Sequence, residues 1–181
     1  MRYLLPVFIV LLLIPCDLFS QLDTVHYIPP LHSRKNHQVS QHYLYISTPS
    51  PTPFSLTIED GAGNVLATAN ISDAAPYIYT IGTTQNTSSK AFVPSNYLNT
   101  VLVNKGLKVY ASAPFYVSLR LRATSQAECL TSKGTAALGT EFRYGGFPQF
   151  SNSGGTTDRN FTAGIMATED NTTITIDGYD S

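Results

Sequence analysis

The chain has 181 residues, only 13% of which are charged, and its formal net charge is −1. So few charges exclude a strongly basic surface for nucleic acid and an acidic disordered tail. Beyond the N-terminus, no apolar run reaches the about 20 residues that a membrane-spanning helix needs. The chain is rich in Thr, Ser, Asn, Gly, Pro and Tyr and has no Trp, which is typical of an extracellular β domain.

The N-terminus has the pattern of an export signal. Arg2 precedes an apolar run over residues 4–14, which is too short to span a bilayer and fits the hydrophobic region of a signal peptide. We predict a signal peptide over residues 1–20, with cleavage between Ser20 and Gln21. The mature protein is therefore expected at the cell surface or outside the cell.

The two cysteines leave alternatives open. Cys16 ends the apolar run and would carry a lipid anchor in a lipoprotein, but Pro15 replaces the small residue that normally precedes such a cysteine, so this interpretation is less favoured. If Cys16 leaves with the signal peptide, Cys129 has no partner for an internal disulfide. Cys129 is then either a buried apolar thiol or paired with a cysteine outside this sequence.

Short alternating runs predict β-strands along the rest of the chain. Residues 21–41 are expected to form an extended lead-in with at most one short edge strand, because Pro29 and Pro30 cannot donate to a ladder. Further on, the apolar period of two is typical of half-buried strands. Strands are predicted over residues 42–47, 54–59, 65–69, 77–81, 101–103, 107–111, 115–122 and 142–144, with a less clear candidate over residues 126–130.

Turn residues separate these strands. Residues 60–64 predict a hairpin turn, and Gly106 supplies the positive φ for a second hairpin. Two apolar runs within residues 161–176 predict a closing hairpin around Glu169, Asp170 and Asn171.

No segment has a helical period. We therefore predict an all-β, antiparallel, sandwich-like or barrel-like domain over residues 42–181. Because the turn residues Asp177 and Gly178 stand close to the last residue, we expect the domain to be incomplete at Ser181.

The histidines and the acidic residues do not predict a metal site. His26, His32, His37 and His42 are five or six residues apart, whereas structural zinc sites combine Cys and His at closer spacing. We expect solvated or locally hydrogen-bonded histidines. Calcium at the Asp170 or Asp177 turn is a less favoured alternative, since aspartates at turns commonly bond the local backbone.

No motif predicts catalysis. The sequence has no Gly-x-Ser-x-Gly elbow and no glycine-rich phosphate loop that leads into a helix. A Ser-His-Asp triad is a spatial arrangement that residue order does not reveal. We predict a protein that is not an enzyme and that needs no cofactor.

The predicted strand over residues 115–122 offers the candidate ligand-binding residues. Tyr116, Arg120 and Arg122 share its polar side. They could bind acidic groups or glycans, with Tyr116 as a stacking surface. The favoured interpretation is the solvated side of a half-buried strand.

Three stretches resemble a known family. Residues 134–142 (Gly-Thr-Ala-Ala-Leu-Gly-Thr-Glu-Phe) and 167–176 (Ala-Thr-Glu-Asp-Asn-Thr-Thr-Ile-Thr-Ile) are similar to segments of the IgGFc-binding protein N-terminal domain family, and residues 115–119 precede them in the expected order. The chain, with Leu-Asp-Thr-Val-His-Tyr-Ile-Pro-Pro over residues 22–30, also looks like the N-terminus of large surface proteins of gliding Bacteroidetes. The resemblance implies a β-rich extracellular binding or adhesion module without known catalytic residues.

We therefore expect an exported, non-enzymatic binding or adhesion module of a large cell-surface protein, with an extracellular protein or glycan as its partner. The alternatives are an accessory domain of a secreted carbohydrate-active enzyme and a structural spacer in a surface fibre.

Overall fold

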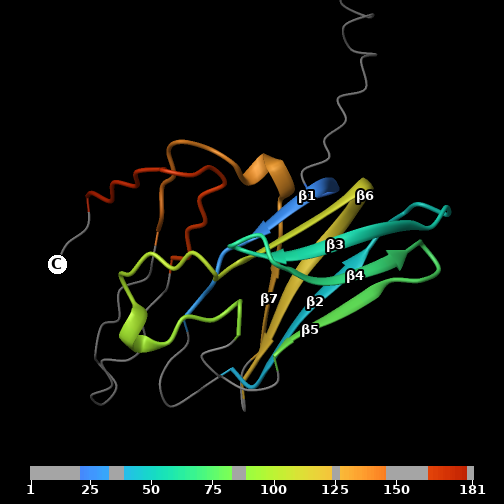
Figure 1. Ribbon diagram of the computed structural model, residues 1–181, viewed down its shortest axis with the longest axis horizontal. Helices are drawn as coiled ribbons and strands as arrows, with labels where there is room; N and C mark the ends of the chain where they lie inside the picture. The colour runs from blue at the N-terminus through green and yellow to red at the C-terminus, as the bar shows by residue number, and fades with distance from the viewer. Residues whose placement is uncertain (1–20, 33–38, 83–88, 124–126, 146–162, 179–181) are drawn as a thin grey trace, which may run out of the picture.

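The computed structural model describes residues 21–32, 39–82, 89–123, 127–145 and 163–178. These residues form an all-β fold of seven antiparallel strands without an α-helix, as predicted (Figure 1). Two short 3-10 helices, η1 (Ser95–Tyr97) and η2 (Gly134–Ala137), complete the elements. The strands are β1 (Asp23–Ile28), β2 (Gln41–Ser47), β3 (Phe54–Asp60), β4 (Val65–Ile71), β5 (Tyr77–Gly82), β6 (Leu107–Arg122) and β7 (Ala127–Thr131).

The long strand β6 organises the sheet. The strand order is β4-β3-β6-β2-β5, and β1 and β7 also pair with β6. In its first half, Val109 lies opposite His26 of β1 and Ile58 of β3. In its second half, Leu119 lies opposite Leu44 of β2 and Leu130 of β7. One strand of 16 residues therefore joins two sets of neighbours.

Residues 112–114 of β6 lie between these two sets of pairs. Pro114, which has no N–H to donate, falls in this interval, where its carbonyl accepts a hydrogen bond of 2.8 Å from Thr48 Oγ1. The sequence predicted two strands here, over residues 107–111 and 115–122. The sheet instead runs through the proline and curls into a half-barrel, so that its two halves face each other across the core.

The core confirms the predicted alternation of strand faces. Phe115, Val117 and Leu119 are buried, whereas Tyr116 and Arg120, which alternate with them along β6, are exposed. The same period of two buries side chains of the neighbouring strands. The core cluster consists of Ile28, Leu44, Ile46, Leu56, Ile58, Ile71, Leu107, Val109, Phe115, Val117 and Leu119.

The predicted hairpin turn at residues 60–64 is confirmed. Asp60 Oδ1 accepts hydrogen bonds of 3.0 Å from the backbone N–H groups of Ala62 and Asn64, and Gly63 has a φ of 79°. Burial raises the pKa of Asp60, but the hydrogen bonds from Lys90, Asn64 and Ala62 outweigh it and hold the pKa at about 2. Asp60 therefore serves to hold the turn between β3 and β4 in place.

Several predicted strands are wrong. Residues 101–103 and 142–144 are not strands, and residues 163–178 contain the Glu169–Asn171 turn but no strand on either side of it. At that turn, Asn171 has a φ of 58° and Thr172 Oγ1 donates a 2.7 Å hydrogen bond to the carbonyl of Glu169. The reason is the same in each place: an alternating run becomes a strand only where a second strand pairs with it, and no described residue does so here.

Gly106 has the predicted positive φ, 84°, but a different role. It leads directly into β6, and its N–H donates a 2.8 Å hydrogen bond to the carbonyl of Lys90.

Figure 1 shows the strands on one side of the molecule and the segments 91–106, 138–145 and 163–178 on the other. In the part of the chain that the structure describes, no helix has the length and apolar character needed to cross a membrane.

Candidate functional site

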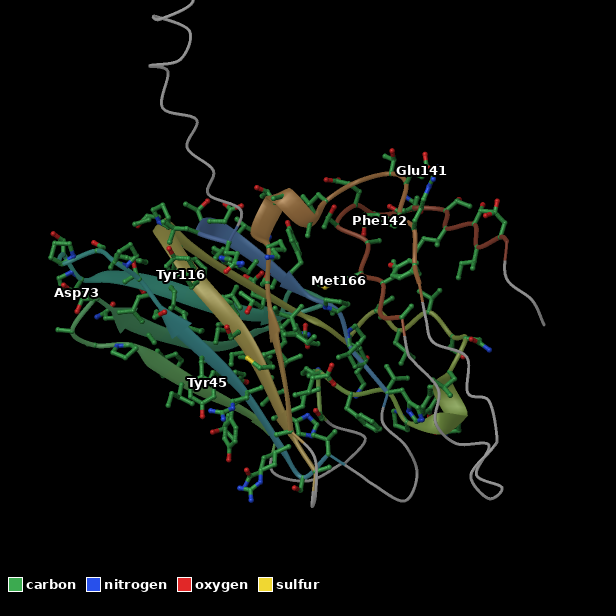
Figure 2. The ribbon with its side chains drawn as sticks, turned by 180° about the vertical axis from the view of Figure 1, so that it is seen from behind. Tyr45, Asp73, Tyr116, Glu141, Phe142 and Met166 are labelled. Atoms are coloured by element: carbon green, nitrogen blue, oxygen red, sulfur yellow. The ribbon has the colours of Figure 1, made fainter. Side chains whose placement is uncertain are left out.

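The outer face of β5, β2, β7 and the second half of β6 gathers polar and aromatic side chains. Strand register places them together, because residues that lie opposite each other point to the same face. We call this surface the tyrosine–arginine face. Figure 2 looks onto it, with Tyr45 and Tyr116 labelled. It comprises Gln41, Tyr43, Tyr45, Ser47, Ile78, Thr80, Tyr116, Ser118, Arg120, Arg122, Ala127, Cys129 and Thr131.

The centre of the tyrosine–arginine face is a contact between Arg120 and Tyr45. Tyr45 lies opposite Ser118, which places it diagonally beside Arg120. The Arg120 guanidinium carbon is 5.6 Å from the centroid of the Tyr45 ring, within the range of a cation–π interaction. Tyr43 meets the same ring edge to face, at a centroid distance of 6.3 Å and an interplanar angle of 74°. Three side chains from two strands therefore hold one another in place.

The three predicted candidate residues lie together on this face. Tyr116, Arg120 and Arg122 are all exposed, and Tyr116 lies opposite Ser47. Tyr43 and Tyr45 also belong to the site, although they were not among the residues predicted for it. Their alternation with Leu44 and Ile46 did predict that they point away from the core, but the register that places them beside Arg120 is not visible in the sequence.

The charges of the tyrosine–arginine face are of one sign. It carries Arg120 and Arg122, and none of its members is acidic. Glu128 of β7 lies opposite Leu121, so it belongs to the other side of the sheet. Among the described residues, neither arginine forms an ion pair. The positive charge is therefore available to a ligand.

The outer face of β3 and the first half of β6 differs, because its charges are matched within the protein. Tyr110 donates a 2.6 Å hydrogen bond to Glu59 Oε1, and this bond raises the pKa of Tyr110. Lys108 Nζ lies 5.2 Å from the Tyr110 ring centroid. Glu59 and Lys108 therefore both contact Tyr110 on this second face, whereas no acidic side chain stands beside Arg120 or Arg122 on the tyrosine–arginine face.

A second candidate for chemistry is the pair His26 and Ser132. His26 Nε2 lies 2.9 Å from the carbonyl oxygen of Phe115, so this nitrogen carries the proton and donates. His26 Nδ1, 3.0 Å from Ser132 Oγ, then accepts from the hydroxyl. Burial lowers the pKa of His26, which keeps the ring neutral.

This arrangement contains the imidazole and hydroxyl of a catalytic triad, but the geometry is that of a structural link. The His26 ring is fully buried, and Ser132 Oγ also accepts a 3.3 Å hydrogen bond from the N–H of Gly134. The nearby Asp23 carboxylate accepts from Thr135 N–H at 2.7 Å and from its hydroxyl. These contacts fasten β1 to β6 and to the segment that leads into η2.

The expectation of solvated or locally bonded histidines is therefore wrong for His26. The reason is that β1 pairs along β6, which brings His26 into the interior. His42 is also buried, with Nδ1 3.4 Å from Ser89 Oγ, and His32 Nδ1 lies 2.7 Å from the carbonyl of Val93. His37 lies outside the described residues. Among the residues that are described, no group of three or more His, Cys, Asp or Glu side chains could hold a metal ion.

One of the two alternatives for Cys129 is wrong, whereas pairing with a cysteine outside this sequence stays a prediction. The thiol is free and exposed on β7, opposite Arg120, and is not a buried apolar side chain. Asp170 and Asp177 are exposed at or near turns. In the described part of the chain, neither belongs to a group of three or more His, Cys, Asp or Glu side chains that could hold a metal ion.

Two of the segments that carry the family resemblance, residues 134–142 and 167–176, lie outside the tyrosine–arginine face, whereas residues 115–119 contribute Tyr116 and Ser118 to it. Figure 2 places Glu141 and Phe142 on the side of the molecule away from the strands. Arg143 Nη2 lies 3.4 Å from Glu141 Oε1 there. Comparisons with protein-family models, with curated proteins and with solved structures return no match for this chain.

Proposed function

We propose that this chain is an exported, non-enzymatic binding module of a cell-surface protein, and that it contacts an extracellular partner through the tyrosine–arginine face. The observation that carries the proposal is the exposed contact of Arg120 with Tyr45, on a face without acidic side chains. The N-terminal signal pattern and the resemblance to the IgGFc-binding family support the same proposal.

The residue types of the face suit recognition. Tyrosine and arginine are enriched among the residues that dominate binding energy at interfaces, since each combines contact area with hydrogen-bonding groups. Tyr45 and Tyr116 remain 37% and 38% exposed, which leaves part of each ring for a partner. Their anchoring on paired strands reduces the conformational entropy that binding would cost.

The proposal excludes a catalytic role for the described residues. The histidine and serine that lie closest to a catalytic arrangement, His26 and Ser132, bond to the backbone and to each other in the interior. An accessory domain of a carbohydrate-active enzyme would use the same face for attachment. A structural spacer would not depend on the face at all.

Export is tested by expressing the chain with its own N-terminus and digesting intact cells with an external protease. The proposal expects an N-terminus at Gln21 and digestion without cell lysis. A chain that keeps residues 1–20 and resists protease until lysis would contradict export.

Binding is tested on arrays of extracellular glycans and matrix proteins, with the exported protein and a Tyr45→Ala/Arg120→Gln variant. We expect at least one ligand whose signal falls by roughly tenfold or more in the variant, the scale set by the loss of a charge-assisted contact. Arg143→Gln is the matched control, since Arg143 is 92% exposed and lies outside the face. A ligand set that is unaffected by the double change, or an array without any signal, would contradict the proposal.

A further inference from the structure

We infer that the ligand of the tyrosine–arginine face is an anionic polysaccharide, with its acidic groups on the arginines and its sugar rings against the tyrosines. The inference rests on the proposed function and adds the class of ligand. Three properties of the face carry it: the sign of its charge, the position of Arg120 beside Tyr45, and the distribution of rings and hydroxyls.

The charge of the face matches an anion. Arg120 and Arg122 lie on the same side of β6, two residues apart, which is about 7 Å along a strand. No member of the face carries a carboxylate, and no described residue forms an ion pair with either arginine. With a net charge of −1 over the whole chain, this concentration of positive charge is local.

The position and chemistry of the Arg120 guanidinium favour a planar acid group. Its guanidinium is held 5.6 Å from the Tyr45 ring centroid, and Tyr43 supports that ring from the side. Guanidinium groups present paired N–H donors that match the two oxygens of a carboxylate or sulfate. Arg120 is exposed on the outer face of the sheet, so these donors can reach a ligand there.

The rings and hydroxyls of the face favour sugar over peptide. The C–H face of a sugar ring is apolar and packs against an aromatic ring, while its hydroxyls bond to small polar groups. Tyr43, Tyr45 and Tyr116 provide rings, and the hydroxyl side chains Ser47, Thr80, Ser118 and Thr131 surround them.

Tyr45 and Arg120 would also suit a protein partner, but the buried core of a protein interface is in addition more apolar than the rest of a protein surface. The one large aliphatic member of the face, Ile78, is on the outer strand β5 and is 53% exposed. The centre of the face is occupied by Arg120 and Tyr45. A peptide is therefore the less favourable occupant.

The repeat of the strands also matches a polymer. Tyr43 and Tyr45 on β2, and Arg120 and Arg122 on β6, recur every second residue. A polysaccharide that repeats the same acid group along its length can contact such rows with successive units, and each further contact adds to the affinity.

The test measures binding of the exported protein to four polymers by isothermal titration calorimetry. Polygalacturonate presents carboxylates on sugars, heparin presents mainly sulfates, dextran is a neutral sugar polymer, and polyglutamate is an acidic peptide. We expect binding to polygalacturonate, to heparin or to both, with affinity that falls as salt is added. A preference for one of the two identifies the carboxylate or the sulfate as the acid group.

Variants tie the binding to the face. Arg120→Gln should weaken polyanion binding by roughly tenfold or more, as expected for the loss of a charge-assisted pair. Arg120→Lys should restore only part of the affinity, because lysine keeps the charge without the planar fork. Tyr45→Ala should also weaken binding, Arg143→Gln should not, and all four variants should keep the thermal unfolding midpoint of the parent.

Other outcomes overturn the inference. Equal affinity for polyglutamate would remove the role of the sugar, and equal affinity for dextran would remove the role of the charge. If no polyanion binds but another array ligand depends on Tyr45 and Arg120, the ligand class is wrong and the proposed function stands. If no ligand depends on these residues, the proposed function fails as well.

Discussion

Asp60 and Lys90 form an ion pair with an Oδ2–Nζ distance of 2.7 Å, although they are 30 positions apart in the chain. The contact joins the turn between β3 and β4 to the segment that precedes β6. The Asp60 side chain is almost fully buried, and Asn64 donates to both of its oxygens at 3.1 Å. One carboxylate therefore fixes two loops.

The ion pair predicts a specific loss of stability in acid. Because the pKa of Asp60 is held at about 2, below the ordinary value of 3.8, its stabilising contribution is present above about pH 4 and is lost as the pH falls toward 2. The difference corresponds to about 2 kcal/mol. Urea unfolding between pH 2 and pH 7 should show this loss in the parent and little of it in Asp60→Asn.

Asp73→Asn is the matched control for this experiment. Asp73 is an exposed aspartate between β4 and β5, and Figure 2 shows it at the end of the sheet. The control should unfold in acid as the parent does. An Asp60→Asn variant with the same acid profile as the parent would contradict the role of the ion pair.

The buried His26 predicts a second pH dependence, closer to neutrality. Burial lowers its pKa, while the bond to Phe115 and the charge of Asp23 act in the opposite direction. As the pH falls, His26 of the unfolded chain takes up a proton near pH 6.5, whereas the buried ring of the folded protein stays neutral to a lower pH. The free energy of unfolding should therefore fall as the pH drops below about 6.5. A proton NMR titration should give a His26 pKa below that of a free histidine.

His26→Gln should remove part of this dependence and leave part, because burial also lowers the pKa of His42. Ser132→Ala should cost about 1 kcal/mol through the lost hydrogen bond. A His26 that titrates at or above pH 6.5 in the folded protein would refute the assignment of a buried neutral ring.

The alternation of β6 predicts opposite outcomes for neighbouring residues. Phe115 is fully buried in the core cluster, and Phe115→Ala should lower the unfolding free energy by about 3–5 kcal/mol. Tyr116 faces outward, and Tyr116→Ala should change it by about 0.5 kcal/mol or less. Similar losses for both variants in denaturant unfolding would contradict the assignment of faces.

Substitutions at two glycines with positive φ allow the cost of backbone strain to be told apart from the cost of a steric clash. A Cβ on Gly63 would have no neighbour within 4 Å, whereas a Cβ on Gly106 would lie 2.9 Å from Met166 Sδ and 3.3 Å from the carbonyl oxygen of Ile28. Gly63→Ala should cost about 1–2 kcal/mol from the left-handed backbone alone, and Gly106→Ala should cost more. Equal costs in thermal unfolding would mean that the segment around Met166 does not pack against β6.

Strands β2 and β3, which the sequence predicted correctly, show an alternation that coincides with burial. Leu56 and Ile58, like Leu44 and Ile46, repeat at the period that a half-buried strand requires, and a second strand lies beside each. Thr172 to Ile176 has the same pattern without a described partner and forms no strand. An alternating apolar pattern shows that a segment favours the strand conformation, whereas strand pairing depends on residues far away in the chain.

The tyrosine–arginine face could be predicted only in part, because it also depends on which strands pair and in which register. The exposure of Tyr116, Arg120 and Arg122 follows from alternation within one strand. The contact of Arg120 with Tyr45 depends on the register between β2 and β6, and the burial of His26 depends on the register between β1 and β6. Long-range register is not encoded in any local pattern of this sequence.

The most direct test of the binding face is a map of amide chemical shifts during titration with an oligogalacturonate. The account predicts that the changes concentrate in residues 41–47 and 116–122, and that Arg120→Gln reduces them. Residues 54–60, on the opposite half of the sheet, serve as the internal control. Changes concentrated in residues 54–60 or 163–178, or changes that Arg120→Gln leaves intact, would contradict the assignment of the tyrosine–arginine face as the ligand site.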